Sequence, residues 1–456
     1  MLDWARGLRR RFGAAAARPR DGLTGGDATL LDLLDLDLLL REAKSADIAA
    51  GRIGARDPDQ RRLEAARVWR EVARRNGDPQ ALRKAAAAAE LAASGFDRRR
   101  RPEAWARARC EQAACALLGA DLTGDSGLDA AAAVAFSDAR LAGRGGLGPV
   151  LADLGLAGVH GRRDLTRGAA DRARAAYAEM SAPIAALDAL TRRLPAVRMI
   201  AADARLARAD LMGDWGERLG DAGLLGLALI DAEAALARLD EAYEPLGFAR
   251  AGLVRGQALA RIGQLEGDLT MLSEACGVLA GAVEAIRCEQ SPLDWARAQA
   301  ALGQALQALG ETADDGHACE RAASCFDRAL TVLKPAAGAP LRARAAAGRA
   351  RALASQADLT GDLAILDAAE VAMKIELAAL RPGLDPSGWA LAQLHLARLY
   401  EARIAITARD DGDRRAKALI ALEAAREVFV ELGQTAGEAG CAEALERLRV
   451  SSAISM

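Results

Sequence analysis

Arginine supplies most of the side chains in this chain that could bind or react. The 456 residues include 56 arginines but only five lysines. A guanidinium group stays protonated near neutral pH and presents a rigid fork of N–H donors that matches a carboxylate or a phosphate. The abundance of arginine therefore indicates recognition of anionic groups rather than proton transfer. Coding bias is the alternative explanation for so many arginines.

Residues typical of enzymes and metal sites are few and scattered. The three histidines, His160, His317 and His395, form no HExxH or HxxxH motif, and the sequence contains no phosphate-binding GxxxxGK[ST] loop. The seven cysteines are odd in number and widely spaced, which is typical of reduced thiols packed in helices. Residues 121–129 contain Asp and Gly but lack the ligand spacing of a calcium loop, so we interpret them as a helix cap. We expect no catalytic residue, no metal and no cofactor.

Composition argues against several classes of partner. The formal net charge is −2 and aromatic residues make up 3% of the chain, so neither a basic excess nor stacking residues for nucleic acid are present. No run of 18 apolar residues could form a membrane span. We expect a cytoplasmic protein that does not bind nucleic acid.

The first 25 residues form a basic, amphipathic segment. If residues 1–16 are helical, Trp4, Leu8 and Phe12 share one face and arginines occupy the other, as in a helix that lies on an anionic membrane surface. This pattern predicts at most a weak peripheral contact with the inner face of a membrane. A frayed terminus, a small capping helix and an organelle transit peptide are alternatives that the sequence leaves open.

Beyond this segment the chain repeats a helical pattern with a period near 47 residues. Counted from Trp295 as position zero, one unit has Leu302, Gly303, Ala322, Phe326 and Ala329 at positions 7, 8, 27, 31 and 34. The other zero positions are Pro58, Trp105, Ala196, Phe248, Pro340 and Trp389. A single globular core rarely exceeds about 250–300 residues, whereas a solenoid escapes that limit because each unit packs only on its neighbours. The repeat therefore predicts an all-α solenoid of helix pairs in which the alanines at position 27 are buried.

Glycine and aspartate mark the expected turn between the two helices of a unit. Glycine can end the first helix in the left-handed conformation, and aspartate can accept the free N–H groups at the start of the second. The pairs are Gly77-Asp78, Gly124-Asp125, Gly213-Asp214, Gly267-Asp268, Gly361-Asp362 and Gly412-Asp413.

The predicted organisation has four segments. The basic residues 1–25 are followed by capping helices and the first repeats in residues 27–143, with Asp27 as the N-cap of the first helix. Residues 144–194 form a degenerate, Gly-rich repeat and a candidate hinge. Residues 195–456 contain the C-terminal repeats and a closing helix.

The pattern of Leu302-Gly303, Leu306, Ala322, Phe326 and Ala329 resembles the tetratricopeptide repeat, with units longer than the usual 34 residues. The last unit is similar, through Leu396-Ala397, Tyr400, Ala418, Leu422 and Ala425. The resemblance implies a right-handed α-solenoid of antiparallel helix pairs. It also implies that the first helices of the pairs line a concave groove that binds a peptide or a partner's helix.

The groove-facing positions of such repeats are mostly arginine or glutamine in this chain. The candidate groove residues are Arg198, Arg250, Arg297 and Arg342 at position 2, and Arg205, Gln257, Gln304, Arg349 and Arg398 at position 9. Arg67, Arg70, Arg107, Arg208 and Arg261 extend the same surface. With many acidic residues in the loops between helices, the sequence predicts a basic inner face with acidic edges. We expect Arg250, Arg297 and Arg342 to be exposed and to form a row along the groove.

Two functions of different class fit this pattern. The first is a non-catalytic scaffold or adaptor that binds an acidic peptide or partner segment in the arginine-lined groove. The alternative is a regulatory sensor subunit whose superhelix changes shape when it binds a small anionic ligand or a signalling peptide. An enzyme is a third and weaker hypothesis, because it would need a cluster of acids that the sequence does not reveal.

Overall fold

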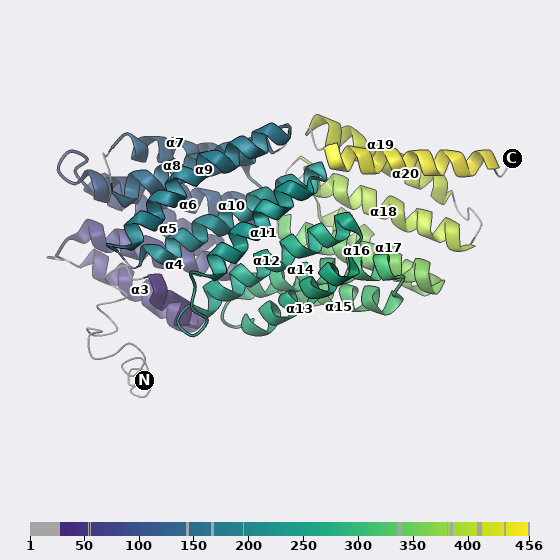
Figure 1. The fold of residues 1–456 in the computed structure, drawn as a ribbon, viewed down its shortest axis with the longest axis horizontal. Coiled ribbons are helices and arrows are strands. Elements are labelled where there is room, and N and C mark those ends of the chain that lie inside the picture. The colour runs from purple at the N-terminus through teal and green to yellow at the C-terminus, as the bar shows by residue number, and fades with distance from the viewer. Residues whose placement is uncertain are drawn as a thin grey trace.

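A computed structural model describes residues 28–454, with short gaps at 53, 55, 143–145, 166–167, 195, 335–339, 381, 384–385, 408–412 and 433–434. The basic segment 1–25 and Asp27 lie outside the described residues. Every regular element within the described ranges is a helix, and no strand occurs there. The all-α prediction is confirmed (Figure 1).

The described helices form eight successive pairs. The first helices are α4 (Pro58–Asn76), α6 (Pro102–Thr123), α8 (Leu147–Asp164), α10 (Val197–Leu219), α12 (Pro245–Glu266), α14 (Pro292–Ala313), α16 (Pro340–Thr360) and α18 (Pro386–Thr407). The second helices are α5 (Pro79–Gly95), α7 (Ser126–Arg140), α9 (Ala170–Thr191), α11 (Ala222–Leu236), α13 (Leu269–Ala285), α15 (Gly316–Val332), α17 (Leu363–Ala379) and α19 (Arg414–Glu431). The 3-10 helix η1 (Ala28–Leu33) and α3 (Leu36–Gly51) precede the pairs, and α20 (Thr435–Ile454) follows them. Successive first helices begin 44 to 50 residues apart.

Most turns within the pairs use the glycine and aspartate that the sequence predicts. Gly77 ends α4 at a φ of 69°, and the side chain of Asp78 accepts a hydrogen bond from the N–H of Gln80 at the start of α5. Gly124-Asp125, Gly267-Asp268 and Gly361-Asp362 make the same turn. In the sixth pair Asp314 takes the place of glycine, at a φ of 54°.

One of the predicted Gly-Asp turns is wrong. Gly213 and Asp214 lie inside α10, which continues to Leu219 because the next turn buries Trp215 completely. Gly220 and Asp221 make that turn instead, at a glycine φ of 62°. At the N-terminal end, Asp35 caps α3 by accepting the N–H of Leu38.

Small residues are buried where the two helices of a pair touch. Ala85, Ala132, Ala275 and Ala322 are each 0% exposed, which confirms the predicted burial at position 27 in these four units, whereas Ala416, at position 27 from Trp389, is exposed. A Cβ atom on Gly303 would lie 3.0 Å from the ring of Phe326, so a larger residue at this position would crowd that ring. These contacts are local, and they explain why the repeat is visible in the sequence.

The degenerate region 144–194 forms an ordinary helix pair, α8 and α9, which packs on α7 and α10. Its glycines are required by close contacts. A Cβ on Gly148 would lie 2.8 Å from the Cβ of Ala106, and one on Gly155 would lie 2.2 Å from the ring of Phe136. The hinge in this region stays a prediction.

The pairs wind into a superhelix whose successive turns touch. Each first helix contacts the first helix of the next pair, so the first helices form the inner layer. Beyond these neighbours, η1 contacts α12, α4 contacts α14, α6 contacts α16 and α10 contacts α20. Each of these contacts joins positions five pairs apart. The superhelix therefore completes a turn in about five pairs. In Figure 1, α12 and α14 lie at about the same height in the view as α4, which α14 contacts.

Candidate functional site

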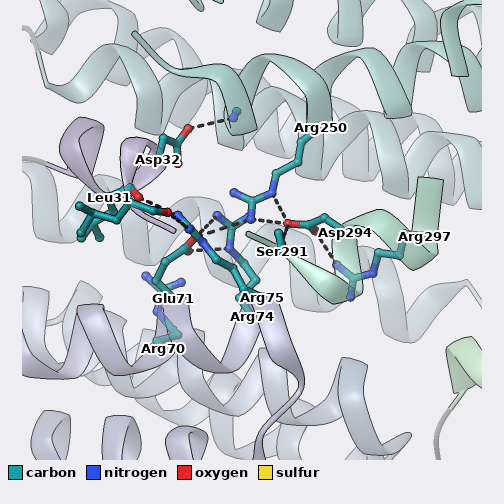
Figure 2. Close-up of polar contacts among 12 residues, drawn as sticks. Leu31, Asp32, Arg70, Glu71, Arg74, Arg75, Arg250, Ser291, Asp294 and Arg297 are labelled. Atoms are coloured by element: carbon teal, nitrogen blue, oxygen red, sulfur yellow. Dashed lines mark hydrogen bonds and ion pairs between the residues drawn. The ribbon is translucent and has the colours of Figure 1, made fainter. Parts of the chain in front are cut away.

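Where the turns of the superhelix meet, charged side chains from η1 and from three first helices gather in what we call the seam cluster: Asp32, Glu71, Arg74, Arg75, Arg250 and Asp294 (Figure 2). Glu71 on α4 accepts hydrogen bonds from Nε of Arg74 at 2.8 Å and from Nε of Arg75 at 2.7 Å. Arg250 on α12 donates to Asp294 on α14 at 2.8 Å and lies 3.5 Å from Glu71. The arginine thus joins carboxylates of α4 and α14.

The seam cluster is buried, and its charges compensate one another. Arg75 is 0% exposed and donates to the carbonyl oxygens of Leu34 at 2.7 Å and Leu31 at 2.8 Å. Burial would raise the pKa of Asp294, but Arg250 and the neighbouring arginines outweigh it and lower the pKa to about 2. A carboxylate that stays ionised while buried must be held by its cationic partners.

The N-terminal cap is tied to the same region by hydrogen bonds. The Oδ2 atom of Asp32 accepts the N–H of Gly247 at 2.8 Å, across 215 residues of sequence. The side chain of Gln290 donates to the carbonyl oxygen of Asp32 at 2.9 Å. Burial raises the pKa of Asp32, against the effect of Arg250. These hydrogen bonds join η1 to α12 and to the residues just before α14.

The structure brings together two of the three arginines expected to form a row. Arg297 lies 3.6 Å from Asp294 and so shares this carboxylate with Arg250. Arg342 instead donates to the carbonyl oxygen of Leu333 at 2.5 Å and to Glu376 on α17 at 2.6 Å. The expectation that all three are exposed is wrong, because the side chains of Arg250, Arg297 and Arg342 are 11%, 33% and 19% exposed.

Three other candidate groove residues bind acids outside the first helices. Arg205 pairs with Asp188 on α9 at 2.5 Å and is 7% exposed. Arg349 pairs with Asp327 on α15 at 2.5 Å. Arg198 pairs with Glu244, which precedes α12. These ion pairs link neighbouring helix pairs.

The remaining candidates keep some contact with solvent. Gln257 on α12 and Arg398 on α18 are half-buried, and Gln304 on α14 is exposed. Burial and the nearby Arg351 lower the pKa of Arg398.

The sequence reasoning missed acidic residues on the inner face. Asp203 and Asp210 on α10 both reach solvent, although first helices of other pairs surround them. Burial among these helices, reinforced by Asp214, raises the pKa of Asp210 to about 7, while Arg261 and Arg297 oppose the change. The spacing of Asp203, Asp210 and Asp214 on one face of α10 was the available signal. The inner face thus carries both signs of charge, and the predicted separation into basic face and acidic edges is wrong in this part.

The histidines do not come together. His160 lines a pocket of about 320 Å³ between α8 and α9, with Arg163, Arg172 and Glu179. His317 lies beside Glu320, and His395 is buried in α18. No cluster of potential metal ligands occurs in the part of the chain that the structure describes. All seven cysteines are free thiols.

The structure defines the protein as an all-α solenoid of helix pairs. None of the described helices has the length and apolar character to cross a membrane.

Comparison with known proteins gives likenesses of helical architecture. No protein-family model and no curated protein matches the sequence. Among solved structures, a Rap protein complexed with competence and sporulation factor aligns over 88% of this chain and 100% of its own, at 12% identity and a TM-score of 0.45. The TPR domain of P58(IPK) aligns over 92% of this chain and 99% of its own, at 16% identity and a TM-score of 0.21.

Proposed function

We propose that the protein is a non-catalytic scaffold or adaptor of the cytoplasm that binds an acidic segment of a partner protein on the inner face of its superhelix. The observation that carries this proposal is a set of inner-layer arginines that keep contact with solvent. Arg67, Arg70, Arg261 and Arg297 belong to three different first helices, and their side chains are 22% to 33% exposed. A scaffold that already positions these forks needs little reorganisation to bind a carboxylate.

On binding, a carboxylate of the partner would replace Asp294 as the group that pairs with Arg297. Arg297 lies beside Asp294 at 3.6 Å, a loose pairing that leaves N–H donors for an acidic side chain of the partner. Gln257 and Gln304, on the same helices as Arg250 and Arg297, would hydrogen-bond the peptide backbone. Because charged groups dominate this surface, we expect affinity to fall as ionic strength rises.

The test uses a fluorescently labelled poly-glutamate peptide of about ten residues and anisotropy titration of the full chain. We expect Arg297→Ala to weaken binding at least tenfold, in line with the loss of a charge-assisted contact. Arg83→Ala is the matched control, because Arg83 is an exposed arginine of the second helix α5. Equal affinities of the two variants, or no peptide binding to the unmodified chain, would contradict the proposal.

A regulatory sensor is the second candidate, and the seam cluster favours it. An anionic ligand that competes with Asp294 for Arg250 would loosen the contact between α4 and the α12–α14 region. A sensor should then change its radius of gyration on binding, whereas a scaffold should keep it. Small-angle X-ray scattering with and without the bound peptide separates the two functions.

A further inference from the structure

A group of three arginines on α4 and α6 surrounds a single carboxylate. Arg70 donates from Nε to Glu111 at 2.5 Å, and Nε of Arg67 lies 3.8 Å from the other oxygen of Glu111. Arg107 lies close enough to Arg67 for their charges to repel. Glu111 is only 6% exposed, so the group forms around a buried acid. Arg67 and Arg70 thus share the carboxylate of Glu111, and Arg107 lies beside Arg67.

Arg107 is the member of this group that lacks a partner. It is half-buried, its Nε atom is buried, and no hydrogen bond reaches that atom from the described residues. On the helix of Arg107, Glu103 lies one turn earlier and Glu111 one turn later, and Oε1 of Glu103 accepts the N–H of Gly148 at 2.9 Å. Glu64 on α4 is likewise held by Gln60 at 3.2 Å. Within the described residues neither Glu103 nor Glu64 forms a hydrogen bond with Nε of Arg107.

The surroundings of Arg67 disfavour its charged form. Burial and the charge of Arg107 lower the pKa of Arg67 to about 10, and Glu111 compensates only in part. The side chains of Arg67 and Arg70 are 22% and 30% exposed, so a molecule in solution can reach the group. An anion placed there would accept hydrogen bonds from Arg107 and stabilise the charged form of Arg67.

We infer that Arg67, Arg70 and Arg107 form a binding site for an oxyanion, a carboxylate or a phosphate group, in which Arg107 is the principal donor. Two guanidinium forks can hold the oxygens of such a group with parallel N–H bonds, while the buried Glu111 fixes the orientation of Arg70. The inference rests on the proposed function in one respect: it places a carboxylate of the acidic partner on the inner face of α4 and α6.

The experiment is isothermal titration calorimetry of the full chain at low ionic strength, with sodium chloride at matched ionic strength as the reference. One arm uses inorganic phosphate, and the other uses the poly-glutamate peptide. We expect saturable binding of at least one probe, weakened tenfold or more by Arg107→Gln. The control Arg83→Gln should stay within about twofold of the unmodified chain, since Arg83 lies on α5 and is exposed. Equal binding by the two variants, or no saturable binding in either arm, would overturn the inference.

A second variant tests the role of Glu111. Glu111→Gln removes the carboxylate that competes with the ligand, so binding should become several-fold tighter. A purely structural role of the arginines predicts no such gain, and unchanged or weaker binding by a folded Glu111→Gln chain counts against the site. Circular dichroism checks that each variant is folded, and the Arg107→Gln result decides if Glu111→Gln fails this check.

The two arms separate this inference from the proposed function. If phosphate binds through Arg107 while the peptide binds nowhere, the oxyanion site stands and the scaffold proposal fails. If the peptide binds equally well to Arg107→Gln and phosphate shows no saturable binding, the scaffold proposal stands and this inference fails.

Discussion

Replacing Arg250 by methionine should loosen the contact between successive turns of the superhelix. Methionine keeps much of the apolar stem but removes the charge that joins Asp294 to Glu71. Breaking a buried ion pair by removing one partner typically costs about 3–5 kcal/mol. Asp294 would still have the hydroxyl of Ser291 at 2.6 Å and Arg297 at 3.6 Å. Because Asp294 keeps these two partners, we expect the free energy of unfolding to fall by slightly less than this range, about 2–3 kcal/mol.

Urea unfolding followed by circular dichroism measures this loss, and Arg255→Met is the matched control. Arg255 lies on the same helix but pairs with Glu233 and Glu274, whose side chains are more than half exposed. Exposed pairs contribute about 0–1 kcal/mol, so the control should change stability little. Small-angle scattering should show a larger radius of gyration for Arg250→Met alone. A loss below about 0.5 kcal/mol, or equal losses in both variants, would refute the role given to the seam cluster.

Three further predictions test the packing, the inner face and the N-terminal segment. Ala322 is 0% exposed, so Ala322→Leu should cost about 1–3 kcal/mol by overpacking, and a thermal unfolding midpoint equal to that of the unmodified chain would contradict the packing described. The folded pKa of Asp210, about 7, lies above the unfolded value of 3.8, so its ionisation destabilises the fold increasingly from pH 3.8 to 7 and fully above that. Asp210→Asn should therefore stabilise the protein most at pH 8 and little at pH 4, as measured by urea unfolding, and an effect independent of pH would exclude this titration; Asp358→Asn, at an exposed acid, is the control. Deleting residues 1–16 should leave the helical content unchanged and release the protein from anionic liposomes in a sedimentation assay, and equal binding of both forms would remove the membrane contact.

The helix pairs could be predicted because the contacts that build them are local. Gly303 and Phe326 belong to one pair, and their close approach imposes a small residue at one fixed position and a large one at another. Such constraints repeat with every unit and so appear in the sequence. The sequence of region 144–194 deviates from the repeat because some of its glycines are required by contacts found only there, such as the contact of Gly155 with the ring of Phe136.

The candidate site could be predicted only in part, because the direction of a side chain depends on helix register. In α10 the residues at positions 2 and 9, Arg198 and Arg205, bind acids outside the first helices, while Asp210 occupies the inner face. The seam cluster could not be predicted at all. It depends on the pitch of the superhelix, which sums small rotations over five pairs and brings Asp32 to Gly247.

The central claim is that an acidic partner binds on the inner layer, and site-specific photo-crosslinking tests it most directly. A photoreactive amino acid would replace Gln304, which is exposed on the first helix α14, or Arg321, which is exposed on the second helix α15. Both proteins would be irradiated with the labelled poly-glutamate peptide and analysed by mass spectrometry. The account predicts crosslinks from position 304 and none above background from position 321. Crosslinks from position 321 alone, or equally from both positions, would contradict binding on the inner face.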